Sequence, residues 1–112
     1  MKILLVCSAG MSTSLLKELM MQECLKEGKN YTICNLDLGI IEREIENTDV
    51  VLLGPQVKHA LKRLVKEYGY KIPIAVLKSE DYGTLNAKNI IYFAEKECEK
   101  FEASMKSKNT VK

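Results

Sequence analysis

Cys7 stands where a cysteine could act as a nucleophile towards phosphorus. It follows the apolar run 2–6 and precedes a stretch of small, hydroxyl-bearing and glycine residues that leads into a helical pattern at Leu15. The backbone N–H groups at a helix N-terminus lack intrahelical partners, and the helix dipole favours an anion there. A thiolate beside such a site is a competent nucleophile for a phosphoryl group. The predicted phosphate-binding loop comprises Ser8, Ala9, Gly10, Met11, Ser12, Thr13 and Ser14.

A phosphocysteine can be hydrolysed, or its phosphoryl group can be transferred to an acceptor. Low-molecular-weight tyrosine phosphatases and related arsenate reductases carry a thiol loop after their first strand, with an arginine six positions after the cysteine. Here that position is Thr13, and no Arg or Lys occurs between Cys7 and Leu16. Without a guanidinium to hold the equatorial oxygens of the transition state, transfer is favoured over hydrolysis.

Two alternatives remain open at this point. A small cysteine-dependent phosphatase or arsenate reductase would need a general acid, for which Asp81 is the candidate, with a solvated loop residue as its other interpretation. A non-catalytic anion-binding or receiver-like module is the second alternative. A receiver would need an aspartate at the end of the third strand, where Gly54 stands.

Strand-like and helix-like segments alternate along the chain. The expected strands are 2–7, 31–36, 49–54 and 72–77, of which the third is apolar enough to be covered on both faces and the fourth carries Pro73, typical of an edge strand. The expected helical segments are 12–27, 40–46, 55–68 and 87–101, and a loop is expected over 79–86.

This alternation predicts an α/β fold, a doubly wound open four-stranded parallel sheet of order 2-1-3-4 with helices on both faces, as in low-molecular-weight tyrosine phosphatases. In such a sheet, strands one and three are neighbours whose chains leave in opposite directions, and ligands bind outside their carboxyl ends. The Cys7 loop and the loop Gly54-Pro55-Gln56 are therefore expected to line one crevice. Gln56 and Tyr82 could bind phosphate or a partner there, or serve only to shape their loops.

Composition limits the class of protein. The chain has 112 residues, 46% of them hydrophobic, which suits one domain over 1–104 followed by a polar, flexible tail at 105–112. Its formal charge of +2 does not indicate nucleic acid, and no apolar run suits membrane insertion or a signal peptide. The four cysteines form no C-x-x-C pair and there is one histidine, so a reduced, cytoplasmic protein without metal or cofactor is expected. Three cysteines are expected to be small core hydrophobes: Cys24, Cys34 and Cys98.

Three blocks of the sequence resemble a known family. They are residues 7–16, from Cys7 to Leu16, residues 49–56, which end in Gly54-Pro55-Gln56, and the pair Tyr82-Gly83. Together they are similar to the IIB components of the bacterial phosphoenolpyruvate-dependent sugar phosphotransferase system, of the lactose/cellobiose/chitobiose family. The resemblance extends to about Phe101.

The resemblance implies a cytoplasmic carrier. Cys7, by its matching position, would accept a phosphoryl group from a phosphohistidine on a IIA protein. It would donate that group to a sugar bound by a membrane IIC permease, at the inner face of the membrane, and a β-linked disaccharide such as cellobiose, chitobiose or lactose is expected. One departure follows Tyr82-Gly83, where relatives often have Met-Asp-Gly and this chain has Thr84-Leu85-Asn86, which leaves the shape of the loop and the sugar open.

Basic residues on the segment 55–68 have no motif position. His59 lies off its apolar stripe and is interpreted as a solvated surface histidine. Lys58, Lys62 and Lys66 form a row with four-residue spacing, which could meet an acidic partner or be a solvated helix face.

Overall fold

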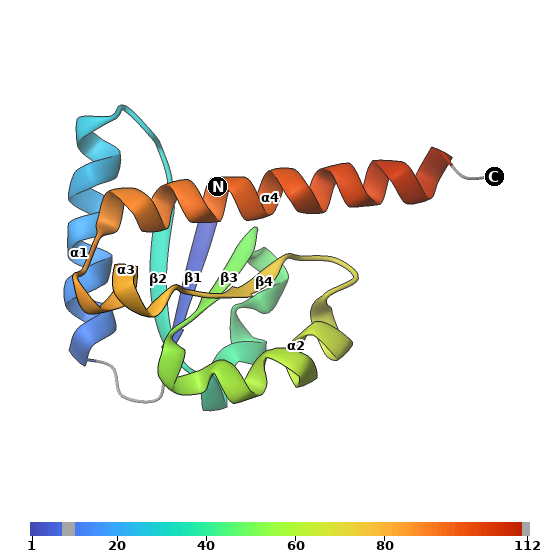
Figure 1. Ribbon diagram of the computed structural model, residues 1–112, viewed down its shortest axis with the longest axis horizontal. Coiled ribbons are helices and arrows are strands. Elements are labelled where there is room, and N and C mark those ends of the chain that lie inside the picture. Colours follow the sequence, from blue (N-terminus) through green and yellow to red (C-terminus); the bar gives the residue numbers. More distant parts are fainter. Residues whose placement is uncertain (8–10, 111–112) are drawn as a thin grey trace.

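A parallel β-sheet forms the centre of the protein, as shown in the computed structural model (Figure 1). The structure describes residues 1–7 and 11–110, with side chains for 1–7 and 14–107. Within these residues the sheet has four strands in the order β2-β1-β3-β4, every neighbouring pair parallel. The strands are β1 Lys2–Cys7, β2 Thr32–Asp37, β3 Val50–Leu53 and β4 Ile74–Val76. The predicted topology is confirmed.

Helices cover both faces of the sheet. Helices α1 (Met11–Lys26) and α4 (Ala87–Thr110) pack on one face, and α3 (Ser79–Gly83) leads from β4 into α4. The opposite face is covered by α2 (Leu61–Tyr68) and by three 3-10 helices: η1 Leu38–Arg43, η2 Ile45–Asn47 and η3 Pro55–Ala60. None of the helices in the described part of the chain is long and apolar enough to cross a membrane.

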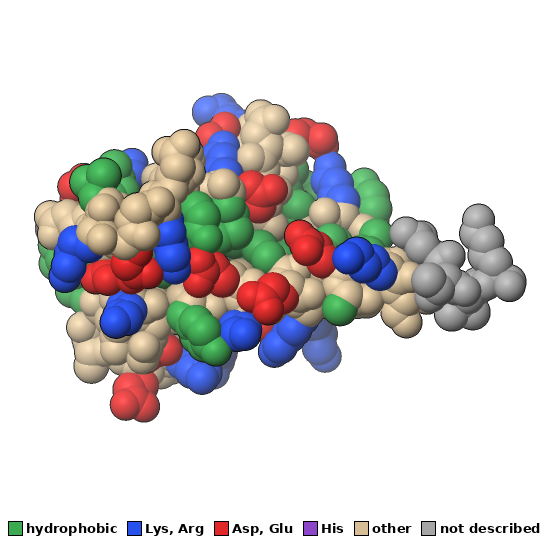
Figure 2. Space-filling model, turned by 90° about the horizontal axis from the view of Figure 1, so that it is seen from above, with side chains coloured by type: hydrophobic (Ala, Val, Ile, Leu, Met, Phe, Trp, Pro, Cys, Tyr) green, Lys and Arg blue, Asp and Glu red, His purple; other side chains and the backbone are tan. Residues whose placement is uncertain are grey.

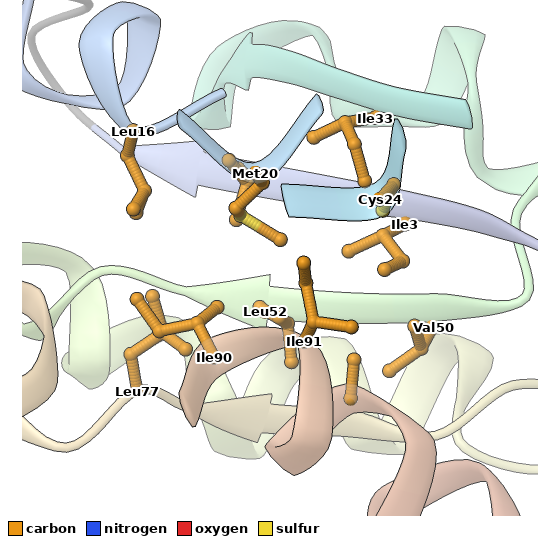
Figure 3. Packing of buried hydrophobic residues seen from close by; sticks show 12 residues of the cluster. Ile3, Leu16, Met20, Cys24, Ile33, Val50, Leu52, Leu77, Ile90 and Ile91 are labelled. Atoms are coloured by element: carbon orange, nitrogen blue, oxygen red, sulfur yellow. The ribbon is translucent and has the colours of Figure 1, made fainter. Parts of the chain in front are cut away.

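The core follows from the two-residue alternation of the strands. Ile3 and Leu5 of β1 point towards α1 and α4, whereas Leu4 and Val6 point towards α2 and the 3-10 helices. Figure 3 shows the first of these clusters, in which side chains of α1 and α4 converge on those of β1, β2 and β3. Every residue of β3 is buried, as expected for a strand covered on both faces.

Pro73 lies just before the edge strand β4. The backbone oxygen of Pro73 accepts a hydrogen bond from the Val51 amide at 3.0 Å. Pro73 thus bonds to β3 through its carbonyl group, and this bond does not require the N–H that proline lacks. β4 pairs only with β3 in the sheet of the described residues. The prediction of an edge strand is confirmed.

The helix expected from Pro55 is divided in two. Residues Pro55–Ala60 form the 3-10 helix η3, and regular α-helix begins only at Leu61. The cause is local: Val57 has the non-helical angles φ −114° and ψ 20°, and its amide bonds the Gly54 oxygen three residues back at 3.0 Å. Tight turns of this kind are common at helix N-termini.

The loop expected over 79–86 contains the short helix α3. Acidic residues Glu80 and Asp81 occupy its first turn, where they complement the helix dipole. Leu85, with φ 53°, ends this turn, and the Asn86 side chain caps α4 by accepting a hydrogen bond from the Asn89 amide at 3.1 Å. The segment expected to be a loop is therefore partly helical.

Helix α4 continues beyond the point where a polar tail was expected. The helix includes residues up to Thr110, whereas regular structure was expected to end near Ser104. Ion pairs three residues apart, Lys96–Glu99 at 3.6 Å and Lys100–Glu97 at 3.4 Å, lie in the turns just before this extension. In Figure 1 its C-terminal part extends past the sheet.

The three cysteines outside the predicted site are not equivalent. Cys24 is buried in the core, whereas Cys34 and Cys98 are half-buried beside it. Burial raises the pKa of the Cys24 thiol and raises that of Cys98 to about 11, so both remain thiols at neutral pH. Cys24 is thus a core hydrophobe as predicted, and the other two are partial ones.

A polar network joins the start of β2 to α4. The Glu95 carboxylate accepts a hydrogen bond from the Tyr31 hydroxyl at 2.6 Å and pairs with Lys29 at 2.8 Å. Burial opposes ionisation of Glu95, but the bonds from Lys29 and Tyr31 outweigh it and lower its pKa. The same hydrogen bond, with burial, raises the pKa of Tyr31 to about 12.

Tyr31→Phe is expected to lower the free energy of unfolding by about 1 kcal/mol at pH 7, because it removes one hydrogen bond to a charged acceptor. The lowered pKa of Glu95 means that this contribution is present above its unfolded value of 4.5 and is lost as pH falls through the folded value. Urea unfolding at pH 7 measures this loss of free energy, and the same measurement at pH 3 shows its dependence on pH. Tyr92→Phe, at an exposed tyrosine, is the control and should change little; equal losses in the two variants would contradict the assignment.

Candidate functional site

Cys7 is the last residue of β1, at the carboxyl edge of the sheet. The alternation of β1 places its side chain on the α1 face, following Ile3 and Leu5, and the residue is only 1% exposed. α1 runs back along the sheet, so its N-terminus lies at the same edge as the end of β1 (Figure 1). Cys7 and the N-terminus of the 16-residue helix α1, which is its positive end, therefore lie at the same edge of the sheet.

The predicted loop is only partly within the described structure. Ser8, Ala9 and Gly10 lie outside the described residues. The backbone of Met11–Thr13 forms the first turn of α1, and their side chains lie outside the description. Ser14 is exposed, and its hydroxyl accepts a hydrogen bond from the Asn35 side chain at 3.2 Å. The first turn of α1 offers amides that have no intrahelical acceptor, which is the chemistry an anion needs.

Gly54 joins the third strand to the residue before the cysteine. Its amide donates to the Val6 oxygen at 2.9 Å, so the loops that follow β1 and β3 leave the sheet side by side. Its backbone is extended, φ −63° and ψ 153°, as the following Pro55 requires. The structure thus brings the Gly54-Pro55-Gln56 loop to the neighbourhood of Cys7, at the switch point of the sheet.

Gln56 and Tyr82 meet across this edge. The Gln56 side-chain amide donates to the Tyr82 hydroxyl at 2.9 Å, which links η3 to α3. A Cβ at position 54 would lie 2.5 Å from Oε1 of Gln56, so the amide rests against the glycine in space that any other residue would fill. The backbone angles of Gly54 would suit any residue. What the position provides is therefore the absence of a Cβ, which lets the Gln56 amide approach the backbone closely.

This contact predicts that Gly54 and Tyr82 are energetically coupled through Gln56. Tyr82→Phe is expected to cost about 0.5–1 kcal/mol in the unaltered protein and almost nothing in a Gly54→Ala background, where the added methyl group has already displaced the amide. In this double-mutant cycle, the effect of replacing glycine on the unfolded state is the same in both Gly54→Ala proteins and therefore cancels.

Urea unfolding of the four proteins measures the coupling, and the side-chain amide resonances of Gln56 report the bond directly. Gly83→Ala is the matched control, because a Cβ there meets nothing within 4 Å. Strict additivity of Gly54→Ala with Tyr82→Phe would show that the hydrogen bond does not contribute.

Two residues of β2 were missed by the sequence analysis. Asp37 pairs in register with Cys7, and Asn35 lies two residues earlier, on the same face of the strand. The Asp37 carboxylate accepts from the Gly39 amide at 2.9 Å and caps η1. The available signal was the position of Asp37 directly after the expected strand 31–36; the order 2-1-3-4 then makes it a neighbour of Cys7.

Other sequence candidates have ordinary structural contacts. Asp81, considered as the general acid of a phosphatase, accepts hydrogen bonds from the Asn89 side chain at 3.2 Å and, through its backbone oxygen, from the Asn86 amide at 2.9 Å. It thereby helps to join α3 to α4. His59 is exposed on η3, in agreement with its interpretation as a surface histidine.

Comparison with known proteins agrees with this geometry. Residues 2–93 match the family model "PTS system, Lactose/Cellobiose specific IIB subunit". The galactose-specific EIIB component of Lactococcus lactis subsp. cremoris is 35% identical over 99 residues, which cover 83% of this chain and 92% of the relative. The cellobiose-specific EIIB component of Lactococcus lactis subsp. lactis has the same identity and coverage.

A solved structure has the same fold. The solution structure of the cellobiose-specific IIB component from Borrelia burgdorferi superimposes with a TM-score of 0.75 at 36% identity, covering 89% of this chain and 93% of that one. Family model, curated relatives and structure all cover most of the chain, and members of this family are phosphotransferases phosphorylated on cysteine. The chain therefore belongs to the lactose/cellobiose-specific IIB subunits of the sugar phosphotransferase system.

Proposed function

We propose that Cys7 carries the phosphoryl group in this IIB subunit. The observation that supports this most directly is the position of Cys7 as the last residue of β1, beside the N-terminus of α1. The sulfur of its thiolate attacks the phosphorus of a phosphohistidine on a IIA protein. The S–P bond forms, the P–N bond breaks, and the imidazole leaves.

In the second step the phosphoryl group passes to a sugar. A hydroxyl oxygen of a sugar held by the membrane IIC protein attacks the phosphorus. The O–P bond forms, the S–P bond breaks and restores the thiolate, and the hydroxyl proton passes to water. The carrier works in the cytoplasm and meets IIC at the inner face of the membrane. Two relatives are named for galactose and cellobiose. We propose that the sugar phosphorylated through this chain is a β-linked disaccharide such as cellobiose, chitobiose or lactose.

The remaining site residues have supporting roles in this proposal. Residues 8–14 hold the phosphoryl oxygens through backbone amides and hydroxyls, because the N-terminus of α1 favours a dianion. Gly54 and Pro55 form the opposite wall, and the Gln56–Tyr82 hydrogen bond holds that wall in one arrangement. The absence of an arginine at Thr13 leaves the phosphorus without the guanidinium that phosphatases use, which favours transfer to an acceptor over attack by water.

The proposal is tested by labelling the protein through the relay. The chain is incubated with phosphoenolpyruvate, enzyme I, HPr and a lactose/cellobiose-type IIA protein. Intact-mass measurement should show a gain of one phosphoryl group, and peptide fragmentation should assign it to Cys7. A phosphoryl group on any other residue would overturn the proposal. Steady turnover of an aryl phosphate or of arsenate without relay proteins would instead identify a hydrolase or reductase.

A further inference from the structure

Positive charge predominates on η3 and α2. The segment from Pro55 to Tyr68 carries four basic side chains, Lys58, Lys62, Arg63 and Lys66, against the single acid Glu67. Its excess of three positive charges exceeds the formal charge of the whole chain, +2. The surface formed by Lys58, Lys62 and Lys66 is called the basic row below.

The lysines of the basic row form no ion pair among the described residues. All three are exposed, and Glu67, the nearest acid in sequence, pairs with Arg63 at 3.8 Å. On α4, by contrast, lysines pair with glutamates three residues away. Figure 2 shows the side of the molecule on which α4 lies, where basic and acidic side chains are interspersed. The positive charge of the basic row is therefore exposed to solvent, where it can attract an acidic partner.

The basic row begins next to the site. η3 starts at Pro55, directly after Gly54, whose amide bonds the residue before Cys7. Lys58 lies only two residues beyond Gln56, which forms the hydrogen bond to Tyr82. A molecule placed over the carboxyl edge of β1 and β3 would thus meet positive charge on one side.

Exposed apolar side chains lie on the other elements that start at this edge. Leu15, near the start of α1, is 52% exposed, and Ile40, on η1 after β2, is 38% exposed. Protein–protein interfaces usually combine exposed apolar side chains with a polar rim. This combination favours a folded protein as the occupant over the headgroups of an anionic membrane, which need only the charge.

We infer that the basic row docks the phosphoryl donor, the IIA protein, through an acidic surface of that protein beside its phosphohistidine. This inference rests on the proposed function. Attraction between the two surfaces speeds encounter and orients the donor's phosphorus towards Cys7, because steering by complementary charge acts mainly on association. The effect is screened by salt.

The test compares two charge-reversed variants. Lys58→Glu/Lys62→Glu/Lys66→Glu alters the basic row, and Lys26→Glu/Lys88→Glu/Lys106→Glu makes the same change in net charge at exposed lysines of α1 and α4. At low salt, the row variant is expected to lose about tenfold in kcat/KM for phosphoryl uptake from phosphorylated IIA, with little change at saturating donor. Its rate should also depend less on salt. The α1/α4 variant should behave like the unaltered protein, and equal losses in both variants would overturn the inference.

Docking is also measured without phosphoryl chemistry. IIA is titrated by calorimetry into Cys7→Ser protein with and without the row substitutions. Weaker binding with the substitutions supports the inference even if labelling at Cys7 fails, which would count against the proposed function alone. Unchanged binding overturns the inference while leaving that function intact. Loss of binding to phosphatidylserine vesicles with unaltered IIA binding would assign the row to a membrane instead.

Discussion

Cys7→Ser is expected to lower the rate of phosphoryl uptake from the IIA protein by at least about a thousandfold. A thiolate is the attacking group in the proposed step, and a serine hydroxyl is weak without an adjacent base to remove its proton. The only histidine of the chain, His59, is exposed on η3. The measurement is the initial rate of mass gain with phosphorylated IIA in excess.

The control for this substitution is Cys34→Ser, the same chemical change on the neighbouring strand β2 at a half-buried position. It should take up phosphate at the normal rate. Because Cys7 is almost fully buried, thermal unfolding must show that Cys7→Ser remains folded at the assay temperature. Normal uptake by a folded Cys7→Ser protein would exclude Cys7 as the carrier.

Leu52→Ala is expected to have the largest effect on stability, about 3 kcal/mol lost from the free energy of unfolding. Leu52 is completely buried in β3, and its side chain lies among those of the sheet, α1 and α4 (Figure 3). Removing it leaves a cavity that rigid strands on both sides cannot fill. Urea unfolding measures the loss as a lower midpoint with an unchanged slope.

Leu25→Ala makes the same substitution at a position that sequence periodicity groups with the core. Leu25 follows the apolar spacing of α1 but is 82% exposed, so the change should stay within about 0.5 kcal/mol. Comparable losses at Leu25 and Leu52 would show that the packing described for this cluster is wrong.

Local patterns were sufficient for the strand order and for the placement of Cys7. The continuous apolar run of β3, Pro73 just before β4 and the alternation of strands with helices each report a short-range preference that the fold satisfies. Boundaries were less predictable. The split at Val57 and the formation of α3 depend on single backbone angles and on contacts with neighbouring elements, which a periodic pattern does not contain.

Side-chain pairing between distant segments could not be predicted from the sequence either. Gln56 and Tyr82 were both candidates, but 26 residues separate them, and only the packing of α3 against the end of η3 makes them partners. Asp37 illustrates the same limit, because its relation to Cys7 exists only through the register of β2 with β1. Such pairings are decided by the free energy of the whole packed arrangement.

The sequence by itself determined the fold class and the family resemblance and singled out the candidate nucleophile, because these follow from local apolar periodicity and from one cysteine placed before a helix. Tertiary structure alone decided which side chains meet at the carboxyl edge of the sheet, which apolar residues of α1 are buried, and that the lysines of the basic row face solvent beside the site. The physical reason is that burial and pairing depend on elements distant in sequence, whereas helix and strand periodicity depend on neighbours along the chain.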